Sequence, residues 1–75
     1  MSESDRLRWR CRRGLLELDL VLERFLQTRF DHLTPEQQQA FERLLDLPDN
    51  DLLDLAMGRA EVMDPESAEI VGMLR

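Results

Sequence analysis

The sequence predicts an all-α protein, a small compact five-helix bundle formed by one domain of residues 1–75. Leucine dominates the apolar residues, tyrosine is absent and β-branched residues are few, which favours helices over sheet. One long segment repeats its apolar residues with the period of a helix, and three segments begin with helix-start signals. A chain of this length buries only ~60% of its unfolded surface, so it cannot enclose a large cofactor within a full core.

The first helix is predicted over Arg6 to Arg12, with Ser4 or Asp5 as its N-cap. The same residues alternate arginine with other residues, which is a strand pattern. The helix is favoured because a lone strand has no partner here and because arginine is a good helix former. Gly14 is predicted to end this helix in the left-handed conformation.

The second helix is predicted from Leu15 to about Phe30 and gives the strongest helical signal of the chain. At ~100° per residue, its apolar side chains share one broad stripe. The stripe consists of Leu15, Leu18, Val21, Leu22, Phe25, Leu26 and Phe30.

The third helix is predicted to begin after Thr34, with Pro35 in its first position and Gln37 completing a capping box, and to end at about Asp46. The fourth helix is predicted to start at residues 48–51 and to stop at Gly58. The fifth is predicted to start at residues 64–66. Short connections predict antiparallel neighbours. The expected core is Leu18, Leu22, Phe25, Phe41, Leu44, Leu45, Leu52 and Ile70.

The charges are unevenly distributed along the chain. The formal net charge is −6, yet residues 1–13 carry five arginines against two acids, and all basic residues are arginine. Arginine presents a planar fork of donors that suits carboxylates at protein interfaces. The acidic remainder argues against a general nucleic-acid binder, so recognition of a protein is the favoured interpretation.

No residue pattern predicts an enzyme, a metal site or a stably bound cofactor. His32, the single histidine, is interpreted as a loop or capping residue, and Cys11 as a small buried hydrophobe whose pKa the nearby arginines could lower. The lone cysteine fits a reducing compartment, and no apolar run approaches the ~18 residues of a membrane span. We expect a cytoplasmic protein that does not insert into membranes.

The segment around Gly14 is the candidate site. Trp9, Arg10 and Arg13 precede or flank the helix break, and they form either a solvated basic helix with Trp9 packed on the bundle or a docking surface for an acidic patch. Glu17 points to the polar side of the second helix, as a partner contact or simply as a first-turn acid that complements the helix dipole.

Two further features of the second helix bear on this site. Asp19 falls inside the apolar stripe, so we expect it to pair with an arginine or with a free helix N–H. Leu16 and Leu20 face away from the stripe, and they either pack on the first helix or leave an apolar strip for a partner.

Arg13, Gly14 and Glu17 form an Arg-Gly-x-x-Glu pattern, with Leu18 and Asp19 following it. Together with the Trp9 region, the Leu44-Leu45 pair after Phe41, the Asp49-x-Asp51-Leu52 start and the Ile70-Val71 helix, it makes the chain resemble the SdhE family of assembly factors for succinate dehydrogenase. The fourth helix departs from the family pattern at residues 56–58, where bulkier or aromatic residues are common.

The resemblance implies a factor that binds the flavoprotein subunit of succinate dehydrogenase or fumarate reductase and promotes the covalent attachment of FAD to it. The factor would be a monomer when free and would bind no nucleic acid, and FAD would reside on the partner. Arg13, Gly14 and Glu17, with Trp9 and Arg10, would form the contact face. An antitoxin role in a toxin–antitoxin pair, also described for relatives, remains the alternative.

Overall fold

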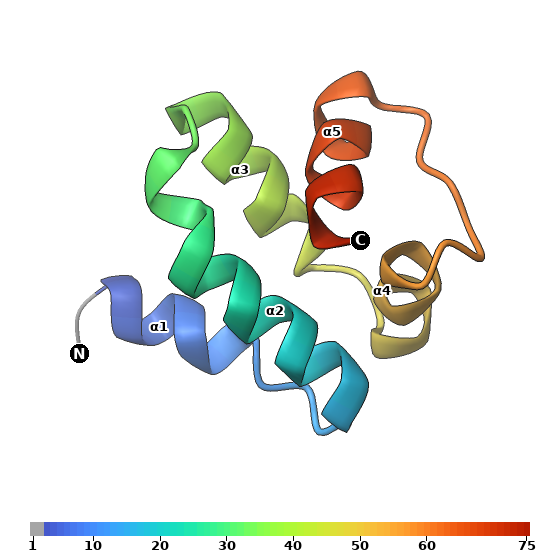
Figure 1. The fold of residues 1–75 in the computed structure, drawn as a ribbon, viewed down its shortest axis with the longest axis horizontal. Helices are drawn as coiled ribbons and strands as arrows, with labels where there is room; N and C mark the ends of the chain where they lie inside the picture. The colour runs from blue at the N-terminus through green and yellow to red at the C-terminus, as the bar shows by residue number, and fades with distance from the viewer. Residues whose placement is uncertain (1–2) are drawn as a thin grey trace.

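The computed structural model describes residues 3–75, with side chains from residue 5 onward, and it is all-α in this range, as predicted. Helices α1 and α2 lie side by side and run in opposite directions, while α3, α4 and α5 cover the other side of α2 (Figure 1). The elements are α1 (Glu3–Arg10), α2 (Leu16–Thr28), the 3₁₀ turn η1 (Phe30–His32), α3 (Pro35–Leu44), α4 (Asp49–Ala56) and α5 (Pro65–Leu74).

Helix α1 confirms the choice of helix over strand, but its predicted limits are wrong. It begins at Glu3, so Ser4 and Asp5 lie inside it and do not cap it. It ends at Arg10, where the N–H of Cys11 is shared between the carbonyls of Leu7 and Arg8 and the helix tightens into its last turn. The arginine alternation that resembled a strand coincides with a helical spacing, because the two buried residues of this segment are Leu7 and Cys11, four positions apart.

Gly14 has the predicted left-handed conformation, with φ of +85°. It does not end α1, however, because the helix has already ended four residues earlier. Gly14 lies instead in the turn of residues 11–15 that leads into α2. Its conformation therefore sets the direction in which the chain enters α2.

Helix α2 ends at Thr28, two residues earlier than predicted, and Phe30 belongs to η1. The Thr28 hydroxyl donates a 2.7 Å hydrogen bond to the carbonyl of Arg24, the local contact by which threonine competes with the helical backbone. Arg29 then leaves the helical conformation, with φ of −126°.

The start of α3 confirms the predicted capping box. The Gln37 N–H donates to the Thr34 hydroxyl at 3.2 Å, and the Thr34 N–H donates to the Gln37 side chain at 2.9 Å. The helix ends at Leu44 rather than Asp46, and the next residues form tighter turns, in which Asp46 donates to the carbonyl of Arg43.

The predicted stop of α4 at Gly58 is confirmed. Gly58 has φ of +79°, and its N–H donates to the Leu55 carbonyl at 3.3 Å. The backbone N–H of Arg59 donates to the Asp54 carbonyl at 2.8 Å. These two bonds are the pair that closes a Schellman motif.

Helix α5 starts where predicted, and Asp64 caps it. The Asp64 carboxylate accepts from the backbone N–H of Ser67 at 3.1 Å and from its hydroxyl at 2.8 Å. Both hydrogen bonds lower the pKa of Asp64 because they stabilise its charged form, and the bond from the Ser67 hydroxyl has the larger effect.

All eight residues expected in the core are buried. Helix α3 packs against α5, and α2 contacts η1, α4 and α5, so α2 is central to the bundle. The rings of Phe25 and Phe30 lie against Phe41, with centroids 4.7 and 5.7 Å apart. Leu7, Cys11, Leu33 and Ala40 complete the core, together with parts of α4 and α5.

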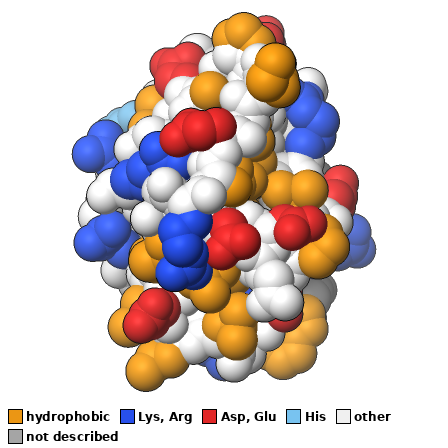
Figure 2. All heavy atoms as spheres, turned by 90° about the vertical axis from the view of Figure 1, so that its right-hand side faces the viewer, with side chains coloured by type: hydrophobic (Ala, Val, Ile, Leu, Met, Phe, Trp, Pro, Cys, Tyr) orange, Lys and Arg blue, Asp and Glu red, His pale blue; other side chains and the backbone are white. Residues whose placement is uncertain are grey.

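The surface bearing α4 and the α4–α5 connection has no large patch of one charge. Acidic, basic and apolar side chains alternate across it (Figure 2). Charges of both signs therefore lie close together on this face.

Candidate protein-docking face

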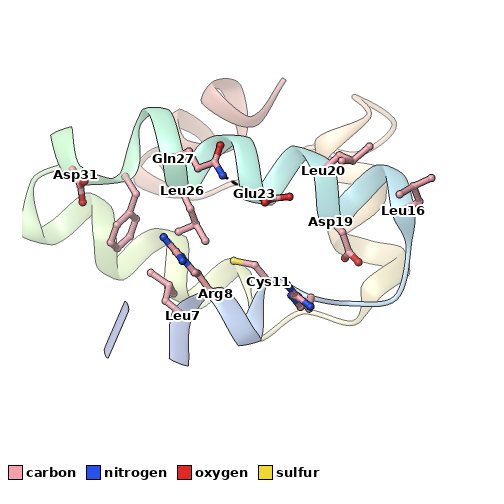
Figure 3. Close-up of a pocket in the computed structure, with 12 residues that line it drawn as sticks. Leu7, Arg8, Cys11, Leu16, Asp19, Leu20, Glu23, Leu26, Gln27 and Asp31 are labelled. Carbon is pink, nitrogen blue, oxygen red and sulfur yellow. Dashed lines mark hydrogen bonds between the residues drawn. The ribbon is translucent and has the colours of Figure 1, made fainter. Parts of the chain in front are cut away.

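A groove of about 490 Å³ runs between α1 and α2, beside the segment that the sequence identifies as the candidate site. Its floor is apolar, with Leu7 from α1, Cys11 from the turn that follows it and Leu26 from α2 (Figure 3). Arg8 and Arg12 line the α1 side, whereas carboxylates of α2 and η1 line the other side. The lining carboxylates are Asp19, Glu23 and Asp31.

Leu16 and Leu20, which line this groove, and Trp9 on α1 are large apolar side chains exposed to solvent. Trp9 is 67% exposed, Leu16 is 74% exposed and Leu20 is 56% exposed. Trp9 therefore does not pack into the bundle, and Leu16 and Leu20 do not pack onto α1. Because an exposed apolar surface beside a groove is typical of interaction sites, these residues favour the docking interpretation.

Glu17 lies in the first turn of α2, between Leu16 and Leu20, and its side chain is exposed as predicted. Among the residues that the structure describes, no hydrogen bond or ion pair engages its carboxylate. Glu17 thus presents a negative charge to solvent beside the exposed Leu16 and Leu20.

Unlike its neighbours in the sequence, Arg13 turns its side chain into the molecule, and only 15% of that side chain is exposed. Its Nε donates to Asp49 Oδ1 at 2.6 Å, which is an ion pair with the first turn of α4. Its two Nη atoms donate to the carbonyls of Leu45 at 2.7 Å and Leu47 at 2.5 Å, and one of them also reaches the carbonyl of Arg10 at 3.4 Å. The guanidinium joins the 11–15 turn to the α3–α4 connection and is not stacked on Trp9.

Asp19 satisfies the expectation that its half-buried carboxylate has a partner. The partners are backbone groups of the preceding turn: the Arg13 N–H donates to Asp19 Oδ1 at 2.7 Å, and the Gly14 N–H donates to Oδ2 at 3.3 Å. Since Leu15, the N-cap of α2, provides no side-chain cap, Asp19 is the residue that attaches the turn to the helix.

Arg10 forms a 2.6 Å ion pair with Asp46 and donates to the carbonyl of Glu42 at 3.3 Å. Its side chain remains 39% exposed, so it both holds α1 against the end of α3 and borders solvent. The structure brings Arg10, Arg13, Gly14 and Glu17 into one region around the 11–15 turn, with Trp9 on the adjoining helix.

Cys11 is buried beneath the groove, with its sulfur facing α2 (Figure 3). Burial raises its pKa from 9.0 to about 11 because the thiolate would lose its hydration. Arg10 and Arg13 act in the opposite direction and are outweighed. The expectation that neighbouring arginines would lower this pKa is therefore wrong in its net direction.

His32 lies in η1 and is exposed, in agreement with its interpretation as a loop residue. Among the side chains of residues 5–75, no three from His, Cys, Asp or Glu are grouped as a metal ion would require. None of the helices in this range combines the length and the apolar character needed to cross a membrane.

Sequence reasoning missed the two arginines of the groove, Arg8 and Arg12. Among the described residues neither guanidinium has an ion-pair or hydrogen-bond partner, so both side chains present charge to the groove. Their spacing of four residues, which places them on one face of a helix, was the available signal.

The fold and this face define a small all-helical protein whose candidate site is a docking surface. Residues 5–75 match the family described as the flavinator of succinate dehydrogenase, and the chain belongs to that family. The expected resemblance to SdhE is confirmed by relatives that are named FAD assembly factor SdhE.

Three of these relatives cover nearly all of this chain. The protein of Coxiella burnetii is 44% identical over 72 residues, which are 96% of this chain and 84% of the relative. That of Legionella pneumophila strain Lens is 47% identical over 73 residues, 97% of this chain and 91% of the relative. That of Methylococcus capsulatus is 44% identical over 75 residues, all of this chain and 90% of the relative.

Proposed function

We propose that this chain binds the flavoprotein subunit of succinate dehydrogenase or fumarate reductase in the cytoplasm and promotes the covalent attachment of FAD to it. The observation that best supports this proposal is that the Glu17 side chain is exposed and has no partner among the described residues. In the sequence it lies between Leu16 and Leu20, which are also exposed. A charge beside exposed apolar side chains combines specificity with buried area in a protein interface. Membership of the flavinator family supports the identity of the partner.

The mechanism is conformational. The residue that bonds to the flavin, and the flavin itself, belong to the partner, whose attachment reaction is self-catalysed once its domains are held correctly. Binding energy from this chain favours that competent arrangement, which is a shift of population and not an added catalytic group. This role requires no stably bound cofactor on the chain.

Gly14 supports the same surface in a different way. A β-carbon built at this position would meet no atom within 4 Å, so the space above Gly14 is open to a partner. A larger side chain would occupy that space and would also adopt an unfavourable backbone conformation at φ of +85°. Gly14 therefore permits close approach between the turn and the flavoprotein.

Trp9 contributes an exposed aromatic ring to the face, and Arg10 contributes charge at its border. Arg13 belongs to the same region, although its guanidinium is engaged inside the molecule. In this proposal the chain is a monomer when free and binds through the surface around the 11–15 turn.

The test mixes the apo flavoprotein subunit, free FAD and this chain, and then detects protein-bound flavin by fluorescence in a denaturing gel. The wild-type chain should accelerate attachment, and Glu17→Ala should weaken binding by ~2–5 kcal/mol if its charge pairs with a desolvated partner. Glu36→Ala is the matched control because Glu36 is also an exposed acid in the first turn of a helix. It should behave as wild type.

Gly14→Arg should also fail to support attachment while its circular dichroism spectrum stays helical. Equal amounts of covalent flavin with the wild type, with Glu17→Ala and with no added chain would refute the proposal. The names of the relatives give no support to the antitoxin alternative.

A further inference from the structure

The geometry points to Arg13 as a positioning residue, which orients Gly14 and Glu17 for the partner and does not recognise the partner with its own charge. This inference rests on the proposed function and deepens it, since it assigns different roles to the residues of one motif. It begins with the hydrogen-bonding capacity of the guanidinium, which offers five N–H donors in a fixed fork.

Four of the five N–H donors of Arg13 are used within the molecule. The Nε and both Nη atoms donate to Asp49, Leu45 and Leu47 at 2.5–2.7 Å, and Nη1 makes a further, longer bond to the carbonyl of Arg10. With 15% of the side chain exposed and one N–H left over, a partner carboxylate could form the usual two-bond fork with this group only by displacing an existing bond. Leaving those carbonyls and Asp49 without their donor would oppose such an exchange.

The acceptors show what the side chain holds in place. Leu45 and Leu47 lie beyond the last residue of α3, where carbonyl groups have no partner in the helix itself. Asp49 lies in the first turn of α4. One guanidinium therefore joins the end of one helix and the beginning of the next to the 11–15 turn, across more than thirty residues of sequence.

The backbone of the same residue is held from the opposite side. The N–H groups of Arg13 and Gly14 donate to the Asp19 carboxylate, which lies on α2 two residues after Glu17. The turn is thus fixed to α3 and α4 through a side chain and to α2 through its backbone. This double attachment sets the position of the open Gly14 relative to Glu17. A partner would recognise that arrangement.

Arg12 provides a direct contrast. It is the adjacent residue and carries the same charge, yet it is exposed and lines the groove, and its guanidinium has no partner among the described residues. If this region needed only positive charge, Arg12 could supply it. The inward direction of Arg13 must serve another purpose, and the contacts identify that purpose as orientation of the turn.

The test uses the full ¹⁵N-labelled chain and records the amide resonances of Gly14 and Glu17. Arg13→Ala and Asp49→Ala should each move both resonances. Two matched controls should leave them in place: Arg12→Ala, which removes the adjacent exposed arginine, and Asp51→Ala, which removes the other first-turn acid of α4. Unchanged Gly14 and Glu17 resonances in Arg13→Ala would overturn the inference.

A second arm measures FAD attachment to the apo flavoprotein subunit against the concentration of each variant. Arg13→Ala and Asp49→Ala should each raise the half-saturating concentration by about tenfold, which corresponds to ~1.4 kcal/mol. The half-saturating concentration of the double variant should be no higher than that of Arg13→Ala, because both changes break the same ion pair between Arg13 and Asp49. A wild-type response from Asp49→Ala beside a defective Arg13→Ala would show direct contact by Arg13 and would overturn the inference.

Arg13→Lys keeps the charge but not the fork, so it should resemble Arg13→Ala in both arms. If Arg13→Ala does not fold, Arg13→Lys and Asp49→Ala are the variants that test the inference. Recovery of wild-type behaviour by Arg13→Lys would mean that charge alone suffices, against the inference. If the wild-type chain does not affect FAD attachment, the proposed function fails, while the resonances of Gly14 and Glu17 still decide whether Arg13 positions the turn.

Discussion

Replacing Asp19 by alanine should destabilise the chain far more than replacing Glu17, although both acids lie in the first turn of α2. The Asp19 carboxylate accepts hydrogen bonds from the backbone N–H groups of Arg13 and Gly14, whereas Glu17 is exposed and engages no described residue. Asp19→Ala therefore removes the carboxylate whose hydrogen bonds attach the 11–15 turn to α2, and Glu17→Ala removes only a favourable charge at a helix N-terminus.

The magnitude follows from the two bonds. The bond from the Arg13 N–H is short, at 2.7 Å, and part-buried, so its loss should cost the ~1.5–3 kcal/mol typical of a hydrogen bond to a charged group. The bond from the Gly14 N–H is longer, at 3.3 Å, and exposed, and water can replace it at little cost. A total loss of ~2 kcal/mol should lower the melting temperature by ~8–16 °C in a domain of this size.

Thermal and urea unfolding followed by circular dichroism measure both variants under the same conditions. Asp19→Asn adds an internal control because it keeps one acceptor oxygen for the Arg13 N–H but loses the charge, so its stability should lie between those of the wild type and Asp19→Ala. A loss for Glu17→Ala as large as that for Asp19→Ala would refute the assignment of inward and outward sides to this helix turn.

Three further predictions concern other parts of the bundle. Leu22→Ala should cost ~2–5 kcal/mol in urea unfolding because Leu22 is fully buried at the centre of α2. Gly14→Arg should stay helical by circular dichroism and lose only the ~1–2 kcal/mol of a left-handed residue, since no atom lies near the new β-carbon. The Cys11 thiol should react slowly with a thiol reagent at pH 8 until urea unfolds the chain. The pKa of this thiol is about 11 in the folded chain and 9.0 ordinarily, so the free energy of unfolding should decrease as the pH rises from 9 to 11. Fast labelling of the native chain at pH 8 would contradict the expected slow reaction.

The starts of α3 and α5 were the parts of the fold most accessible to sequence reasoning, whereas the start of α1 was predicted wrongly. The capping box of Thr34 and Gln37 and the cap provided by Asp64 both depend on residues three positions apart. Such chemistry is local, so the sequence shows it directly. The periodic stripe of α2 predicted its buried residues for the same reason.

The predicted ends of α1, α2 and α3 lie beyond the observed ones, and at α3 a contact with a distant segment takes part in ending the helix. The apolar and polar pattern of α3 continues past Leu44, yet the carbonyls of Leu45 and Leu47 accept bonds from the Arg13 side chain. No pattern within α3 reveals an acceptor role toward a residue more than thirty positions earlier. Gly14 shows the same limit: its conformation was predicted correctly, but its place outside α1 depends on where that helix ends.

The candidate site was also predictable in part. The outward direction of Glu17 follows from helical geometry, as does the exposure of Leu16 and Leu20. The inward direction of Arg13 does not, because an arginine outside a helix has no periodic neighbours that define its side. Its ion pair with Asp49 exists only in the folded chain, and the sequence alone gave no means to separate it from the exposed Arg12.

The spacing of the motif can now be understood from the geometry of the first turn of α2. Residues two apart on a helix point ~200° away from each other, so a carboxylate at position 19 that turns back to the Arg13 and Gly14 N–H groups leaves position 17 facing the opposite way. The turn must therefore be held by Asp19 for Glu17 to be available outside. An arginine that fixes the turn, a glycine that keeps its surface open and a glutamate that projects from it require this order and this separation, and a carboxylate moved from position 17 to 18 would enter the core beside Leu22 and Phe25.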